Sequence, residues 1–312
     1  MIKIEKIIIW GYKLFSHTHS FIHKGYYEGF KKLGYEVYWF DHDDNVSNFN
    51  FNNSLFITEH NCDINIPLNS KSLYFVHNLY NEISDYNQIP RENVVDFRCS
   101  FRDMLRNGYP YYLEINKYAY GFVDKNNKIF YTLWGTDIFP EEIDNNIKNL
   151  DKFQTKREIV LVGSPTKEWE EVWKWCKNNQ VRYVRYGASF NVRNRQMNKD
   201  IKETQKLIQE SLIAPAIQTE LQIKDHYVPC RIFKNISYGK MGITNSKFVN
   251  ELFDNKLIYD KDVNECLNKG MKFKDMDKLK ELMIYVRDNH TYLNRINEMK
   301  QFIKEYTNFR LD

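Results

Sequence analysis

The chain has 312 residues, of which 42% are hydrophobic and 28% charged, proportions typical of a soluble globular protein with room for two domains. Its net charge of +4, without any arginine-rich tract, permits an anionic small substrate and argues against a nucleic-acid-binding protein. The five cysteines are dispersed and form no C-x-x-C pair, so neither a zinc site nor a disulfide framework is indicated, and reduced thiols predict a cytoplasmic protein. The first apolar run is too short to span a membrane, so membrane contact is expected to be peripheral at most.

The first half of the chain alternates apolar strands with a helix. Lys6–Trp10 is almost continuously apolar, as in a strand buried on both faces of a parallel sheet. A polar loop that contains His17 and His19 follows, and a helix is predicted over residues 21–33, before a second strand at Glu36–Phe40. This order predicts a βαβ unit.

The remaining strands of the first half are short. They are predicted at residues 55–58, 72–76, 92–97 and 128–133. His77 directly follows the second of these. The charged, Asn-rich segment 141–156 is predicted to be an interdomain linker, so the first domain is assigned to residues 1–150.

The second half begins a new series of strands and helices with a strand at Glu158–Val162. The series continues with a helix at 167–179, strands at 181–186 and 212–217, helices at 200–209 and 229–238, a short helix at 247–253, a strand at 256–259 and two terminal helices. Because the pattern runs twice, we expect an α/β fold of two Rossmann-like domains that face a central cleft, with the second domain at residues 151–285.

The helix predicted to begin at Pro229 and to end before Gly239 has two different faces. Proline suits a first helical residue because its missing N–H would have no partner there. One face carries Arg231, Lys234, Asn235 and Tyr238, while the other is apolar and would pack on a sheet. A helix N-terminus with two basic side chains beside it suits a diphosphate, although an ordinary amphipathic helix with solvated charges gives the same pattern.

The segment HYVPCRIFKNISYG, from His226 to Gly239, resembles the donor-site signature of GT-B glycosyltransferases and the C-terminal donor-binding domain of their group 1-like members. The glycine-bearing turn after the strand at Glu158–Val162 and the pair Thr244-Asn245 resemble further parts of that domain. The resemblance implies a GT-B fold and transfer of a hexosyl or deoxyhexosyl group from a nucleotide-sugar to a glycan or other hydroxyl acceptor, with no cofactor and no metal ion.

The resemblance also assigns residues to the donor site. They are Gly163, Ser164, Tyr186, Gly187, His226, Val228, Pro229, Arg231, Lys234, Asn235, Thr244 and Asn245. Lys234 stands where the family usually has a ribose-binding glutamate, so Lys234 is expected to meet phosphate instead. By the same resemblance, residues 286–312 would form a C-terminal helix that packs back on the N-terminal domain.

Catalysis that inverts the sugar requires a base for the acceptor hydroxyl, and histidine suits this role near neutral pH. His19 is the leading candidate and His17 the second, because both lie in the loop after the first strand; hydrogen-bonded loop histidines are the alternative. His77 resembles the histidine of retaining family members and would take the catalytic role there. His23 falls inside the predicted helix and is expected to pack.

Other functions find weaker support in the sequence. The acidic stretch Asp41-His42-Asp43 has the D-x-D form of metal-dependent transferases, and Asp41 could serve a dinucleotide fold, but the chain lacks G-x-G-x-x-G after its first strand. This absence disfavours a dehydrogenase. A noncatalytic nucleotide- or sugar-binding protein and a GT-B-like epimerase or phosphorylase stay open as alternatives.

Overall fold

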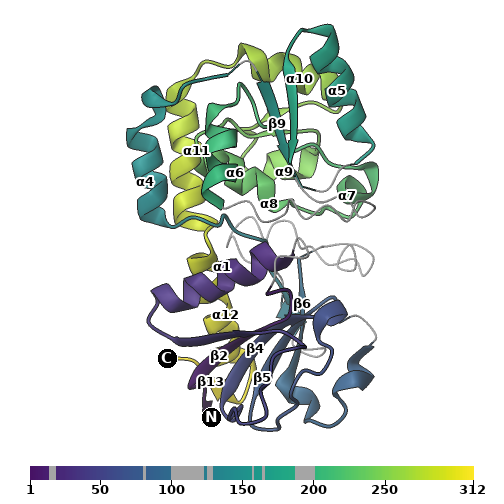
Figure 1. Cartoon of the computed structure of the whole chain (residues 1–312), viewed down its shortest axis with the longest axis vertical. Coiled ribbons are helices and arrows are strands. Elements are labelled where there is room, and N and C mark those ends of the chain that lie inside the picture. Colours follow the sequence, from purple (N-terminus) through teal and green to yellow (C-terminus); the bar gives the residue numbers. More distant parts are fainter. Residues whose placement is uncertain are drawn as a thin grey trace. The chain divides into compact units, whose positions relative to one another are not determined.

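The computed structural model describes residues 1–13, 19–79, 82–99, 123–124, 129–156, 158–163, 166–186 and 201–312. The chain divides into two compact units (Figure 1). Unit 1 comprises Met1–Leu133 and Tyr292–Asp312, and unit 2 comprises Trp134–Thr291. Across the ranges described, no helix combines the length and apolar character that crossing a membrane requires.

Unit 1 is built on a seven-stranded sheet with the order β3-β2-β4-β5-β6-β8-β7. The strands are β2 (Lys6–Trp10), β3 (Glu36–Phe40), β4 (Ser54–Glu59), β5 (Leu73–His77), β6 (Val94–Arg98), β7 (Val123–Asp124) and β8 (Ile129–Tyr131), with short 3-10 turns at His60–Cys62, Glu82–Tyr86 and Arg91–Asn93. All neighbouring strands are parallel except β7 and β8. The parallel strand pattern predicted for this half is confirmed, and β4 and β5 are buried along their whole length.

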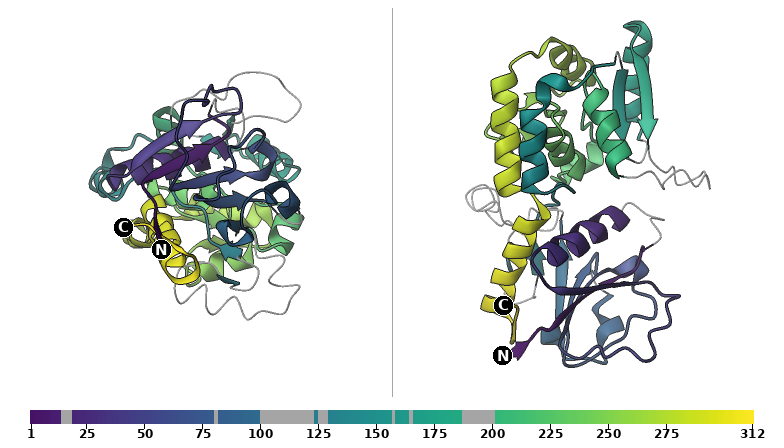
Figure 2. Two further views of the ribbon diagram at one scale, coloured as in Figure 1. Left: turned by 90° about the horizontal axis from the view of Figure 1, so that it is seen from below. Right: turned by 60° about the vertical axis from the view of Figure 1, so that its left-hand side comes forward.

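Helix α12 (Tyr292–Tyr306) closes unit 1 by packing on α1 (His19–Lys32). Two glycines of α1 allow this approach, since a Cβ on Gly25 would lie 2.2 Å from the Tyr292 ring. Both ends of the chain belong to this unit, because β1 (Ile2–Lys3) pairs in parallel with β13 (Phe309–Arg310). Figure 2 shows the two termini next to each other.

A buried ion pair fixes α12 from inside unit 1. Arg295 is fully buried, and its Nη1 donates to the Glu298 carboxylate, which also accepts the Thr132 hydroxyl of the segment after β8. A charged pair is tolerated in a core only when its hydrogen bonds are satisfied in this way. The last helix is therefore an integral part of unit 1.

Unit 2 contains two parallel strand pairs, β9 (Glu158–Val162) with β10 (Arg182–Tyr186), and β11 (Ile243–Thr244) with β12 (Ile258–Tyr259). The predicted strand at 212–217 was wrong in form, since only an isolated bridge joins Ile213 to Ile159. The segment is nevertheless buried, and the Ala216 amide donates to the Ile243 carbonyl at 2.8 Å. Pro215 has no N–H to give a ladder, which accounts for the missing strand.

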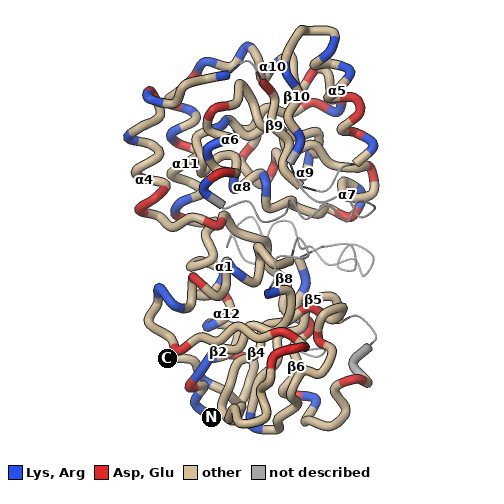
Figure 3. Tube along the Cα trace, in the orientation of Figure 1, with Lys and Arg blue, Asp and Glu red and all other residues tan. Residues whose placement is uncertain are grey.

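Eight helices surround these strands among the residues described. They are α4 (Pro140–Lys148), α5 (Glu168–Asn178), α6 (Ile201–Glu210), α7 (Glu220–Lys224), α8 (Cys230–Ser237), α9 (Lys247–Leu252), α10 (Val263–Lys272) and α11 (Met276–Asn289), and a 3-10 turn lies at Leu150–Lys152. Lys, Arg, Asp and Glu alternate along the outer helices, without a single basic tract (Figure 3). Counting α12, three helices follow β12 instead of the two predicted.

The predicted linker at 141–156 was also wrong, because most of it forms α4. Ile143 is fully buried, α4 packs on α11, and Asp144 accepts from Arg287 at 2.7 Å. A polar helix with only two isoleucines, Ile143 and Ile147, has the composition of a loop, so composition alone misses it. The first break between the units therefore precedes the residue 150 boundary that composition suggests.

Candidate functional site

Unit 2 gathers buried polar atoms without partners where β9 leads into α5. Arg231 Nη1, Trp169 Nε1, Thr166 Oγ1 and Glu168 Oε2 are buried and make no hydrogen bond within the described part of the chain. The Arg231 guanidinium lies 5.6 Å from the centre of the Trp169 ring. Each unpaired buried donor costs about 1–3 kcal/mol, so an acceptor from outside the chain is expected here.

Gly163 lies next to the Arg231 guanidinium, and its backbone conformation requires glycine. Its φ of +130° suits glycine, and a Cβ there would lie 3.8 Å from Arg231 Nη1. Burial lowers the pKa of Arg231 from its usual value, while Cys230 and Tyr227 act in the opposite direction. No carboxylate in the described chain pairs with the guanidinium, so the site combines an arginine whose Nη1 is buried with a glycine turn and suits an anion.

Lys234 is paired with a carboxylate of its own unit, whereas the sequence predicts that it meets phosphate. Burial alone would lower its pKa, but the Asp137 carboxylate, 2.8 Å from Lys234 Nζ, outweighs burial and raises that pKa. The Tyr238 hydroxyl donates to the same carboxylate, and Tyr238 is fully buried. Lys234 is therefore already neutralised within unit 2, which argues against its predicted role as a phosphate ligand.

Asn235, Thr244 and Asn245 hold the backbone of unit 2. The Asn235 amide donates to the Ala214 carbonyl at 2.6 Å. Asn245 bonds both the amide and the carbonyl of Gln218, at 2.8 and 2.9 Å. Thr244 accepts from the backbone amide of Ser246 at 3.1 Å. The predicted polar face of α8 is thus partly internal, and the Asn235 bond satisfies a backbone carbonyl of the segment 212–217.

The loop before α8 is also well packed. His226 has a left-handed backbone with φ of 47°, its ring stacks on Phe248 at 4.4 Å, and burial lowers its pKa. Val228 is buried. Pro229 is the N-cap residue with an extended backbone, so the helix begins at Cys230, one residue later than predicted. The first amides of α8 lie directly beside Arg231.

Tyr186 is the remaining predicted donor residue that the structure describes. Tyr186 ends β10 and pairs with Val162, the residue before Gly163, so it lies at the same edge of the strand pair. His17, Ser164 and Gly187 lie outside the described residues.

Unit 1 brings two predicted histidines together at the carboxyl edge of its sheet. His19 is the first residue of α1, and His77 is the last residue of β5. Their ring centres are 5.0 Å apart. Parallel strands commonly present functional groups at this edge, so the arrangement suits a site for substrate chemistry.

The hydrogen bonds of His77 define its protonation state. Its Nδ1 lies 2.9 Å from the Phe97 carbonyl, which can only accept, so Nδ1 carries the proton. Its Nε2 lies 3.8 Å from the Cys99 thiol. Burial lowers the pKa of His77 to about 4, and the ring is therefore neutral at neutral pH.

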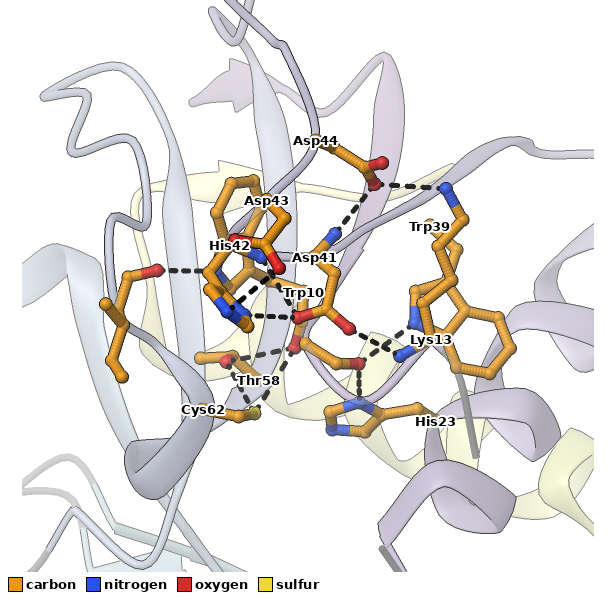
Figure 4. A network of polar contacts seen from close by, with 12 residues as sticks. Trp10, Lys13, His23, Trp39, Asp41, His42, Asp43, Asp44, Thr58 and Cys62 are labelled. Atoms are coloured by element: carbon orange, nitrogen blue, oxygen red, sulfur yellow. Dashed lines mark hydrogen bonds and ion pairs between the residues drawn. The ribbon is translucent and has the colours of Figure 1, made fainter. Parts of the chain in front are cut away.

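His23 packs as the sequence predicts. It is buried, and its Nδ1 donates to the Gly11 carbonyl at 2.9 Å. Trp39 Nε1 donates to the same carbonyl at 3.0 Å (Figure 4). These contacts fix the turn that leaves β2.

The acidic stretch after β3 satisfies its own hydrogen bonds (Figure 4). Asp41 accepts from the Lys13 amide at 2.9 Å and from His42 Nδ1 at 3.0 Å, and Asp44 pairs with Lys13 Nζ at 3.0 Å. The bond to Asp41 and the charge of Asp43 raise the pKa of His42. Within the described ranges, no group of three His, Cys, Asp or Glu side chains could hold a metal ion.

Two residues at these sites escape prediction from the sequence. Trp169 appears in the sequence as one of several apolar residues at helical spacing, which predicts only core packing. Glu59 ends a buried strand, and an acidic residue at such a strand end is a signal that could have identified it.

Comparisons with known proteins identify the fold. No protein-family model matches the chain, and no curated sequence matches it significantly. A solved structure described as an alpha-glucosyltransferase in complex with UDP-glucose and DNA containing an abasic site is similar, with a TM-score of 0.55 and 10% sequence identity. The match covers 96% of this chain and 99% of that chain. The chain therefore has the α/β GT-B fold that its sequence predicts.

Proposed function

We propose that the protein is a glycosyltransferase that moves a hexosyl or deoxyhexosyl group from a nucleoside-diphosphate sugar to a hydroxyl acceptor, without a metal ion. The single observation that carries the proposal is the unpaired, buried Nη1 of Arg231 beside Gly163. A diphosphate oxygen would supply the acceptor that this group lacks. The GT-B fold and the UDP-glucose named for the similar structure support this choice of donor.

The donor would bind to unit 2 through its diphosphate. Arg231 and the first amides of α8 would stabilise the negative charge that develops on the diphosphate as it leaves, which is the task that a metal ion performs elsewhere. Trp169 Nε1 offers another buried donor in the same place. Lys234 is left out of this clamp because Asp137 already neutralises it.

Transfer joins the acceptor oxygen to the anomeric carbon and breaks the bond from that carbon to the diphosphate oxygen. The hydroxyl proton must pass to a base, for which we propose His19 in unit 1. His77 is the less suitable base, because Phe97 holds one of its nitrogens and the Cys99 thiol faces the other. This assignment favours inversion at the sugar.

The acceptor proposed from the sequence is a glycan or another hydroxyl compound, and a cytoplasmic location accords with five free cysteines. The similar structure contains DNA, so duplex DNA belongs among the acceptors that a test should include. A location in the cytoplasm would give the enzyme access to nucleotide-sugars and to either acceptor.

Two measurements test the proposal. A thermal-shift screen with UDP, GDP and ADP should raise the melting temperature for at least one of them, because a ligand of the native state stabilises it. The matching UDP-, GDP- or ADP-sugar should then release free nucleoside diphosphate when oligosaccharides or duplex DNA are supplied.

Other outcomes would select a rival function. A thermal shift without any release in the presence of acceptors indicates a noncatalytic binding protein. Turnover without a separate acceptor indicates an epimerase, and turnover that requires inorganic phosphate indicates a phosphorylase. No shift with any of the nucleotides would contradict the proposed donor site.

A further inference from the structure

Glu59, the last residue of β4, is a buried carboxylate at the carboxyl edge of the unit 1 sheet, with 1% of its surface exposed. It accepts hydrogen bonds from the Tyr12 hydroxyl at 3.0 Å, the Asn78 side-chain amide at 2.8 Å and the Asn61 backbone amide at 3.1 Å. Because β2, β4 and β5 are neighbours in the sheet, Glu59 connects the segments that follow all three strands.

Two of these donors have left-handed backbones, with φ of 56° at Tyr12 and 58° at Asn78. Asparagine tolerates this conformation, but tyrosine rarely adopts it, and surrounding contacts must hold it in place. The Gly11 carbonyl, just before Tyr12, is held by His23 and Trp39 (Figure 4). Strained residues fixed in this way concentrate at functional sites.

The Tyr12 ring reaches the predicted catalytic histidine. It stacks on the His19 ring, with centres 6.1 Å apart and an angle of 22° between the planes. Two more histidine rings lie nearby, His77 at 5.0 Å from His19 and His23 at 5.8 Å from Tyr12. A shift of the Tyr12 ring would therefore change the surroundings of His19 directly.

We infer that Glu59 is a positioning residue for His19, acting through Tyr12. Glu59 anchors the Tyr12 hydroxyl, and the anchored ring holds the His19 imidazole in the orientation needed to take the proton of the acceptor hydroxyl. The inference rests on the proposed function, because it gives His19 the part of the base. It adds Glu59 and Tyr12 to the machinery of unit 1.

The test compares Tyr12→Phe and Glu59→Gln with a matched control, Tyr38→Phe, which removes another Tyr–Glu hydrogen bond on the exposed part of β3. The kinetics of UDP release from UDP-glucose are measured for each. Both site variants should lose about 10- to 100-fold in kcat with little change in KM for UDP-glucose, since the donor site lies in unit 2. The double variant should lose no more activity than the more impaired of the two single variants, because both changes break the same Glu59–Tyr12 hydrogen bond.

A second readout follows His19 without any turnover. The NMR signal of its imidazole, identified by its loss in His19→Gln, should shift in Tyr12→Phe and Glu59→Gln and stay unchanged in Tyr38→Phe. Unchanged His19 signals in folded Tyr12→Phe, or unchanged kcat, would overturn the inference. If the wild-type protein releases no nucleoside diphosphate from UDP-, GDP- or ADP-sugars, the proposed transfer fails, and the NMR signals alone decide whether Glu59 and Tyr12 position His19.

Discussion

Replacing Arg231 by methionine separates the effect of its unpaired Nη1 on ligand binding from its effect on folding stability. Methionine keeps an unbranched apolar side chain against Trp169, while it removes the charge and the buried Nη1 donor. The variant should lose affinity for the nucleoside diphosphate and yet fold as well as the wild-type protein.

The magnitudes follow from the contacts of this one side chain. A hydrogen bond from a charged group contributes about 1.5–3 kcal/mol, so binding of UDP should weaken roughly 10- to 150-fold. In the free protein the change removes an unpaired donor that costs about 1–3 kcal/mol, and it forfeits about 1–2 kcal/mol of attraction to the Trp169 ring. These opposing terms leave the unfolding free energy between about 1 kcal/mol below and about 2 kcal/mol above the wild-type value.

Isothermal titration with UDP measures the first effect, and urea unfolding without ligand measures the second. Lys206→Met is the matched control, because Lys206 belongs to the same unit, carries the same charge and is 74% exposed. The control should bind UDP as the wild-type protein does. UDP binding of wild-type strength in Arg231→Met would refute the reasoning, as would a loss of stability well above about 3 kcal/mol, since that would mean that Arg231 serves the fold.

Three further predictions concern the described contacts. Lys234→Met should lower the unfolding free energy by about 3–5 kcal/mol, because it leaves the buried Asp137 carboxylate without its cation, while the affinity for UDP stays unchanged. In urea unfolding, the double variant Lys234→Met with Asp137→Asn should recover much of this loss. Weaker UDP binding by Lys234→Met would instead assign Lys234 to the diphosphate clamp. The unfolding free energy should fall as the pH drops below about 6.5, by up to roughly 3 kcal/mol near pH 4. The reason is that His77 takes up a proton in the unfolded chain, whereas in the folded protein it stays neutral down to its pKa of about 4. Unfolding curves of His77→Gln should show a flatter pH dependence, and an equal slope would contradict the assignment. Gly25→Ala should destabilise the protein, because its Cβ would overlap Tyr292 and overpacking of about 1–3 kcal/mol exceeds the roughly 1 kcal/mol gained in helix propensity; a thermal melt beside the exposed control Lys31→Ala tests this, and a raised melting temperature would contradict it.

The predictable part of the fold consists of its buried strands. Continuous apolar runs such as Lys6–Trp10 and Glu158–Val162 predict strands of a parallel sheet that are buried on both faces, and both runs form the expected strands. The run at 212–217 is just as apolar, but Pro215 interrupts its ladder, and the Asn235 side chain bonds the Ala214 carbonyl. Side-chain bonds of this kind depend on residues distant in the chain, so local pattern cannot show them.

In the candidate sites, too, local sequence patterns predict some residues, while others depend on contacts between distant parts of the chain. Arg231 and His19 can be proposed from the sequence because a helix N-terminus and a strand–helix loop are recognisable there. The pairing of Lys234 with Asp137 cannot, since the two residues meet only in the folded unit. Trp169 resembles a core residue because burial and ligand binding select the same residue type, and only an indole nitrogen without a partner distinguishes them.

The composition of unit 1 from both ends of the chain has a consequence for its synthesis. A ribosome releases residues 1–133 well before α12, so Phe75 and Phe130 lack their packing partner Phe302 until α12 has been synthesised. Unit 2 is continuous, and a bridge between Thr136 and Thr291 closes it at its two ends. At ~5–20 residues per second, the delay is on the order of ten seconds or more, so the later unit should fold first and chaperones should bind the earlier one.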